Sequence, residues 1–189
     1  MTRLARFALL SLAAVAALGS SGCFNKEEFT TVGHTEGIYV TVDELKYQIQ
    51  ISRQLNAADT EDQAYLRGLP EGVEPPSRDE TWFAIFIRVE NDSDEQQVAA
   101  ETFEIEDTQE KIYRPVLLDE RTNVFAYRPV PVAPKGGLIP DPDSAAGQGA
   151  IQGSLLLFKL TNESLQNRPL EFRIKSARES GEAIVDIDV

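Results

Sequence analysis

The chain has very few of the side chains that bind soft metal ions or act as nucleophiles. Its 189 residues include one cysteine (Cys23), one histidine (His34) and one methionine, which is the initiator. Copper and zinc sites are built from several Cys, His or Met ligands, and a Ser-His-Asp triad needs a histidine held rigidly beside its serine. His34 falls in a polar segment that we expect to be a tether. We therefore expect a non-enzymatic protein without a cofactor or a soft-metal site.

Basic residues are also scarce. The chain has 18 Lys and Arg against 31 Asp and Glu, a formal net charge of −13. Residues 1–22 hold two of the basic residues and none of the acidic ones, so a chain that begins at Cys23 carries 16 basic and 31 acidic residues, or −15. Nucleic-acid binding requires Lys and Arg to neutralise phosphates. The composition therefore excludes a nucleic-acid partner and favours a cationic one.

The N-terminus resembles the export signal of a bacterial lipoprotein. Two basic residues, Arg3 and Arg6, precede an apolar run at residues 7–19, and small residues lead to Cys23. This is the organisation of a secretory signal. In lipoprotein signals the cysteine sulfur takes a diacylglyceryl group and becomes the first mature residue. The family usually has Leu three residues before that cysteine, whereas this chain has Ser20.

Two alternatives to lipidation at Cys23 remain open. One is ordinary cleavage after Ala16 or Gly19, and the other is an uncleaved anchor, since residues 7–25 carry no charge. A membrane-spanning helix needs about 20 predominantly apolar residues, and the polar and small residues after Leu18 disfavour it. All three place the domain outside the cytoplasm. The lipid would supply two fatty acyl chains, such as palmitate, which is enough for stable anchoring at the extracytoplasmic face of the cell membrane.

The remaining chain is the size of one ordinary domain. We expect a signal peptide at residues 1–22, a polar tether at 23–36 and a β-sandwich domain at 37–189. The 167 residues left after removal of the signal can bury roughly 70% of their unfolded surface. With Cys23 lipidated, no thiol remains for disulfides, so this domain must be held together by its hydrophobic core.

Alternating apolar residues predict an all-β fold. We expect strands at residues 38–42, 45–51, 81–90, 98–106, 112–113, 153–161, 170–175 and 185–189. The segments 81–90 and 153–161 are apolar on both faces, which is typical of central strands covered on both sides. The apolar positions 98 and 100 are out of phase with 103 and 105, which predicts a bulge between them. Seven or eight such strands favour an antiparallel, immunoglobulin-like β-sandwich.

One helix and one long connection interrupt the strands. Thr60, with Gln63 three residues later, predicts a capped helix at about residues 61–67, inside an insertion at 56–77. Residues 128–149 are rich in proline and glycine and predict a long loop. Its flank carries Phe125, Tyr127 and Arg128, residue types that are enriched in interfaces. The segment is either a packed crossover between sheets or a partner-binding loop, and we name these three residues as the candidate partner contacts.

A dense acidic segment provides the one candidate metal site. Residues 90–110 contain nine carboxylates and no basic residue. Hard cations take clustered oxygen ligands, so Asp92, Asp94 and Glu95 are a weak calcium candidate. A solvated sheet edge is the competing interpretation, because the spaced calcium loop with its turn glycine is missing.

Several motifs together resemble a family of bacterial lipoprotein domains of unknown function. They are Trp82-Phe83 leading to Val89 and Asn91, Phe103-x-Ile105-x-Asp107 leading to Tyr113, and Gly147 followed by Gly153-x-Leu155 leading to Phe158. The family resemblance implies an immunoglobulin-like sandwich related to a mycobacterial secreted immunoprotective antigen, and it implies no catalytic residues. This chain differs in having Glu110 where the family usually has Gly, and in the insertion at residues 56–77.

These observations predict a membrane-tethered, non-enzymatic protein-interaction module of the cell envelope. The alternative is an envelope protein that binds a small molecule or a cation such as calcium. A concave site flanked by Tyr127 and Arg128 would favour the alternative, whereas a closed core without a pocket near the long loop would disfavour it.

Overall fold

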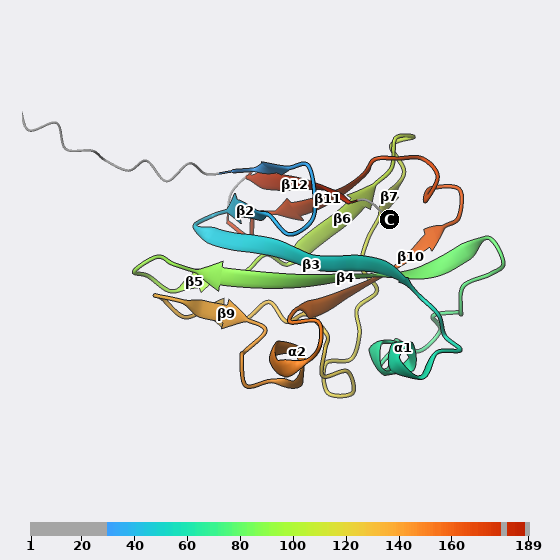
Figure 1. Cartoon of the computed structure of the whole chain (residues 1–189), viewed down its shortest axis with the longest axis horizontal. Helices are drawn as coiled ribbons and strands as arrows, with labels where there is room; N and C mark the ends of the chain where they lie inside the picture. The colour runs from blue at the N-terminus through green and yellow to red at the C-terminus, as the bar shows by residue number, and fades with distance from the viewer. Residues whose placement is uncertain (1–29, 179–180, 188–189) are drawn as a thin grey trace, which may run out of the picture.

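The computed structural model describes residues 30–178 and 181–187, which fold into two β-sheets packed face to face (Figure 1). The strands are β1 (Val32–Gly33), β2 (Tyr39–Val42), β3 (Leu45–Leu55), β4 (Glu80–Asn91), β5 (Gln97–Val98), β6 (Thr102–Glu106), β7 (Ile112–Tyr113), β8 (Pro131–Val132), β9 (Gly137–Ile139), β10 (Ser154–Thr161), β11 (Leu170–Lys175) and β12 (Glu182–Ile187). The helices are α1 (Thr60–Tyr65) and α2 (Ala145–Gln148). The signal peptide and Cys23 lie outside the described residues.

The strand pairing confirms the expected antiparallel sandwich. The first sheet has the order β1-β12-β11-β6-β7, and the second has the order β10-β4-β3-β2 with β9 also paired to β4. The short strands β5 and β8 form a separate two-stranded sheet. Within the described residues every pair is antiparallel except β1 with β12. Seven of the described strands have four or more residues, in agreement with the expected seven or eight.

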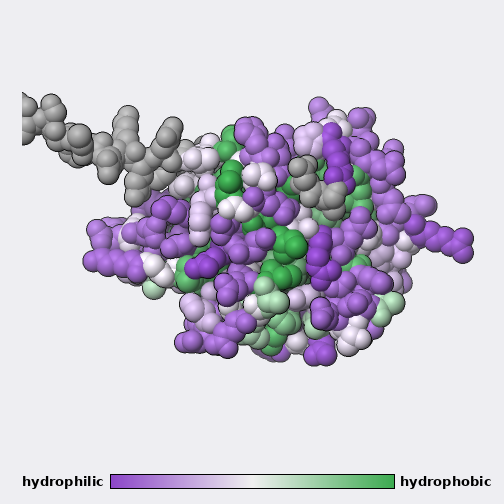
Figure 2. All heavy atoms as spheres, viewed as in Figure 1, coloured by the Kyte–Doolittle hydropathy of each residue, from purple (hydrophilic) through white to green (hydrophobic). Residues whose placement is uncertain are grey.

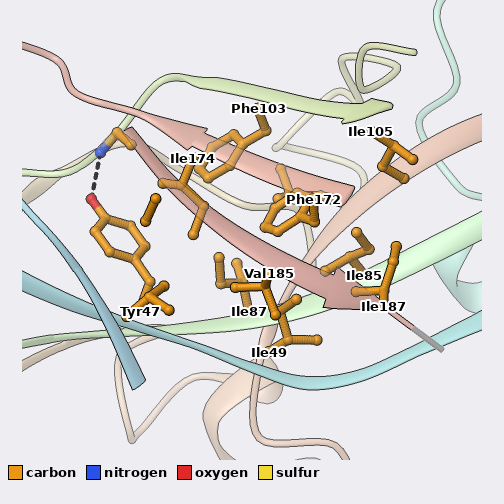
Figure 3. Close-up of a cluster of buried hydrophobic side chains, with 14 of the residues drawn as sticks. Tyr47, Ile49, Ile85, Ile87, Phe103, Ile105, Phe172, Ile174, Val185 and Ile187 are labelled. Carbon is orange, nitrogen blue, oxygen red and sulfur yellow. Dashed lines mark hydrogen bonds between the residues drawn. The ribbon is translucent and has the colours of Figure 1, made fainter. Parts of the chain in front are cut away.

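The main core fills the space between the two sheets (Figure 3). Ile85 and Ile87 of β4 face Phe172 and Val185 of the opposite sheet, and all four are at most 2% exposed. The rings of Phe103 and Phe172 stack with their centroids 5.8 Å apart. Burial of apolar surface contributes about 25 cal/mol per Å², so this core is the main source of stability in a chain without disulfides.

Strand β4 is apolar on both faces because both faces are covered. Phe83 and Ile85 belong to the core between the sheets, whereas Trp82 and Phe86 belong to a second cluster on the outer face of the second sheet. Tyr65 of α1 and Phe125 of a connecting segment cover this outer cluster. Both helices lie on that side of the second sheet (Figure 1). The expectation that residues 81–90 form a central strand covered on both sides is confirmed for β4. The side chains of β10 are likewise buried on both faces, although this strand ends the order of its sheet.

A bulge in β3 reverses the side-chain alternation that the sequence predicts. Ile49 pairs with Ile87, but Ile51 pairs with Phe86, so Gln50 is an extra residue in the strand. After an insertion of one residue, every following side chain changes face. Ile51 is therefore 36% exposed rather than buried with Leu45 and Ile49. The apolar residues at every second position from Leu45 predict that Ile51 lies on the same face as Ile49, and this prediction was wrong.

The phase difference between residues 98–100 and 103–105 has another cause than the expected bulge. β5 pairs with β8 in the small sheet, whereas β6 pairs with β11 and β7 in the first sheet. The chain changes sheets between them, and Ala99 and Ala100 are buried at this crossing. Because β5 and β6 belong to different sheets, their inward-facing residues need not follow one continuous alternation.

The domain takes in part of the segment that we expected to be a tether. Val32 and Gly33 pair in parallel with Ile184 and Val185 of β12. In addition, the backbone N–H of Thr41 in β2 donates to the carbonyl of Thr30. The ordered pairing therefore begins before residue 37 and joins both sheets. Among the described residues, no helix is long and apolar enough to cross a membrane.

The proline-rich segment at residues 128–149 has more regular structure than expected. It contains β8, β9 and the short helix α2. The buried side chains of Val132, Ile139 and Ala146 attach it to the rest of the fold. This agrees with the interpretation as a packed crossover.

Candidate functional site

Residues 123–129 are held in place by a buried asparagine. The side-chain amide of Asn123 donates to the carbonyls of Tyr65, at 2.8 Å, and Arg67, at 3.0 Å, and its oxygen accepts from the N–H of Phe125. Asn123 is 1% exposed. Because a buried amide is stable only when its polar atoms are paired, Asn123 fixes this segment to the end of α1.

The helix α1 begins one residue earlier than the sequence predicts. Asp59, and not Thr60, is the N-cap, and its carboxylate accepts from the backbone N–H groups of Glu61 and Asp62. Asp at the N-cap satisfies N–H groups that have no partner within the helix. The helix presents Tyr65 to Phe86 and Phe125, with both ring centroids 4.9 Å away.

Two of the three candidate partner contacts are engaged in packing. Phe125 is half-buried in the outer cluster against Tyr65. Tyr127 is half-buried with its ring 5.0 Å from that of Phe103, and its hydroxyl donates to the carbonyl of Ala100 at 2.8 Å. Burial raises the pKa of the Tyr127 hydroxyl well above its usual value. Their aromatic character thus has a structural explanation, which the prediction of a free contact surface did not include.

Arg128, the third candidate, is exposed. Its Nε lies 3.4 Å from Oε2 of Glu120, and its guanidinium also donates to the carbonyl of Glu120. Exposed ion pairs of this kind contribute at most about 1 kcal/mol. The pairing of Arg128 with Glu120 therefore adds little to the stability of the fold.

Two hollows flank residues 126–129. The larger, with a volume of about 730 Å³, lies between residues 124–133 and 136–146 and includes Arg128 and Ser154 in its lining. The smaller, of about 420 Å³, lies between residues 115–118 and 126–129. Ala126 lines both. Both volumes are within the range of about 300–1,000 Å³ that is usual for ligand sites.

Exposed aliphatic side chains border these hollows. Leu117 is 83% exposed, Val124 54% and Val130 46%. Single exposed apolar residues are normal, but a group of them beside a concave surface is typical of an interaction site. The face shown in Figure 2 is mostly hydrophilic, with separate hydrophobic patches between the polar residues. We call the two hollows with Leu117, Val124 and Val130 the double-hollow surface.

The acidic segment does not assemble a calcium site. Asp92 pairs with Lys46 at 2.5 Å and Asp94 with Lys135 at 3.3 Å. In the part of the chain that the structure describes, no group of three or more Asp, Glu, His or Cys residues could hold a metal ion. The calcium candidate at Asp92, Asp94 and Glu95 is therefore wrong, because two of its carboxylates are paired with separate lysines.

A second group of charges covers the outer face of the first sheet. Glu104 is only 3% exposed and accepts from Lys175 at 2.6 Å and from Arg114 at 2.8 Å. The hydrogen bond from Lys175 is the main reason that the pKa of Glu104 is lowered. Since both oxygens of this carboxylate are taken up by basic side chains, it has a structural role in the sheet.

The histidine lies beside the sheet. Nδ1 of His34 is 3.2 Å from Oδ2 of Asp186 in β12, and its side chain is 84% exposed. Among the described residues, no serine or threonine hydroxyl is hydrogen-bonded to it. The arrangement is an exposed contact between β12 and the residue that follows β1.

One solved structure supports the fold. The yjhA protein from Bacillus subtilis superimposes with a TM-score of 0.52 and 10% sequence identity over 82% of this chain and 99% of that one. An uncharacterized β-sandwich protein from Clostridium difficile 630 aligns with a TM-score of 0.41 and 11% identity, over 82% of this chain and 93% of that one. No known family model and no curated protein sequence matches the chain. At such low identity the first structure supports the β-sandwich fold alone.

Proposed function

We propose that this chain is a lipid-anchored, extracytoplasmic protein-interaction module that binds its partner through the double-hollow surface. The observation that carries the proposal is the gathering of exposed Leu117, Val124 and Val130 around two concave sites. Protein interfaces combine an apolar centre with a polar rim. The N-terminal sequence supports the location, since Cys23 follows a basic and then an apolar segment.

Point substitutions on this surface test the interaction. Deleting residues 125–149 would remove β8, β9 and α2 together with Phe125 and Tyr127, so a lost interaction could reflect misfolding. Leu117→Asp and Val130→Asp change exposed side chains instead. We expect both variants to lose proteins that photo-crosslink to the wild type in intact membranes and to keep its melting temperature.

Val32→Asp is a matched control, because Val32 is 47% exposed and belongs to β1 rather than to the hollows. If Leu117→Asp and Val130→Asp retain the same crosslinked proteins as the wild type and the control, the double-hollow surface is not the interaction site.

The anchor has its own test. Mass spectrometry of the mature N-terminus should find a diacylglyceryl group on Cys23, and the Cys23→Ala variant should lack it and leave the membrane fraction. An unmodified Cys23, or a mature chain that starts elsewhere, would contradict the lipid anchor.

A small-molecule binding protein is the second candidate function, and the hollows lined by Tyr127 and Arg128 are the feature that we expected to favour it. The volume of the larger hollow, about 730 Å³, favours it, because this volume suits a drug-sized ligand. Native mass spectrometry of the protein purified from its membrane separates the two functions: a bound small molecule of constant mass would favour this candidate, and its loss in Val130→Asp would place it in the larger hollow.

A further inference from the structure

The smaller hollow is an opening between the edges of the two sheets. Phe103 of the first sheet and Leu155 and Leu156 of the second sheet contribute to its lining. We call it the inter-sheet crevice. Most residues that line it are apolar, so an apolar group of a ligand can lie against them.

The crevice is open because the chain leaves one sheet edge for the other. β7 ends at Tyr113, and Pro115 follows it. The N–H of Val116 then donates to the carbonyl of Leu157 at 2.7 Å, and the N–H of Tyr127 donates to the carbonyl of Leu155 at 2.9 Å. Residues 115–118 and 126–129 are thus fixed along β10 as the two walls of the crevice.

Two carboxylates give the crevice a negative rim. Glu101 and Glu120 both contribute to the lining. Glu120 is paired with Arg128, whereas Glu101 is exposed and forms no ion pair within residues 30–178 and 181–187. The chain as a whole has a net charge of −13. An apolar interior with an acidic rim complements a group that is itself apolar with a cationic end.

We infer that the inter-sheet crevice binds a basic, apolar segment of the partner protein, with an aliphatic side chain in the crevice and an adjacent Arg or Lys at Glu101 and Glu120. This rests on the proposed function and deepens it by naming the chemistry of the partner. Arg128 competes with the incoming cation for Glu120. Removal of Glu101 and removal of Arg128 therefore have opposite effects on binding.

The probe is a fluorescent peptide, Leu-Arg-Leu with blocked ends, and its neutral isostere has citrulline in place of Arg. Binding to the full mature protein in detergent micelles is measured by fluorescence anisotropy. We expect the Arg peptide to bind about two- to fivefold more tightly than the citrulline peptide, the range of one exposed ion pair. The difference should shrink at 0.5 M salt, where exposed charges are screened.

Charge-matched variants locate the site. Glu101→Gln should weaken binding of the Arg peptide about two- to fivefold, and Arg128→Gln should strengthen it. Neither should change binding of the citrulline peptide. The controls Glu95→Gln and Arg121→Gln change the net charge equally at exposed residues that do not line the crevice, and they should have no effect.

Equal binding of the two peptides, or equal effects of Glu95→Gln and Glu101→Gln, would overturn the inference. The crosslinking result separates this failure from that of the proposed function. If Leu117→Asp abolishes crosslinking but the peptides bind alike, the surface is an interface and the basic partner segment is wrong.

Discussion

Tyr47→Phe tests how the crossing between β5 and β6 is held. The backbone N–H of Ala100 donates to the hydroxyl of Tyr47 at 2.8 Å, and both residues are 1% exposed (Figure 3). The Tyr127 hydroxyl donates to the carbonyl of the same alanine. Two tyrosines from different parts of the chain therefore satisfy both backbone groups of Ala100 where the chain changes sheets.

The expected magnitude follows from the burial. Phenylalanine keeps the ring but leaves the N–H of Ala100 without an acceptor, and an unsatisfied buried donor costs about 1–3 kcal/mol. Tyr127→Phe leaves a carbonyl without its donor, which is less unfavourable because under-satisfied carbonyls are tolerated better than N–H groups. We expect a loss of about 2 kcal/mol for Tyr47→Phe and about 1 kcal/mol for Tyr127→Phe.

Urea denaturation measures both losses as a lower midpoint at an unchanged slope. Tyr39→Phe is the matched control, because the Tyr39 hydroxyl donates at 3.3 Å to Glu90 from a residue that is 39% exposed. Its free energy of unfolding should change by at most about 0.5 kcal/mol. If Tyr47→Phe costs no more than Tyr39→Phe, the buried hydrogen bond does not stabilise the crossing as argued.

Three further changes have defined outcomes. Glu110 has φ 62°, the left-handed region that favours glycine, so Glu110→Gly should raise the free energy of unfolding by about 0.5–1 kcal/mol, and a lower urea midpoint would refute this. Because the pKa of Glu104 is lower in the folded protein than in the unfolded chain, its carboxylate stabilises the fold above about pH 4.3, and this stabilisation is lost as the pH falls through the folded-state pKa. In Glu104→Gln the free energy of unfolding from urea titrations at acid pH should depend less steeply on pH, and an unchanged dependence would contradict this. Deletion of residues 183–189 removes most of β12, which lies between β1 and β11, so we expect no cooperative thermal transition; wild-type melting would refute the strand assignment.

The sequence predicts best those strands in which each face is either buried or exposed along its whole length. β4 could be predicted because both of its faces are covered along the strand, so its large apolar residues on either face all indicate burial. The alternation in β3 fails at Ile51 because a single bulge changes the face, and Gln50 has no property that marks it as the extra residue. The expected strands leave a break at Asp43 and Glu44, but the positive φ of these two residues could not be predicted because neither is glycine.

The partner-binding role of Phe125, Tyr127 and Arg128 stays a prediction, but the structure shows what surrounds these residues. Tyr127 lines the smaller hollow and Arg128 the larger, whereas Phe125 lines neither. The rings of Phe125 and Tyr127 are packed against Tyr65 and Phe103. Asn123 and Ala100, which fix the segment, were missed because a single buried amide or alanine has no periodic signal. The crevice itself combines Phe103, Leu117 and Leu155 from three distant segments, and only the pairing of the sheets brings them together.

The early entry of the chain into both sheets leaves only a short segment between residue 23 and the sandwich. Backbone pairing begins at Thr30, and the seven steps from Cys23 to Thr30 span at most about 25 Å even when fully extended. With a lipid on Cys23, the start of the sandwich stays within that distance of the bilayer surface. The domain is then confined to a thin layer above the membrane and does not diffuse through the whole compartment. This raises the effective concentration of partners that are held in the same layer. A weak interaction at the crevice would suffice for a membrane-bound partner and would be too weak for a freely diffusing one.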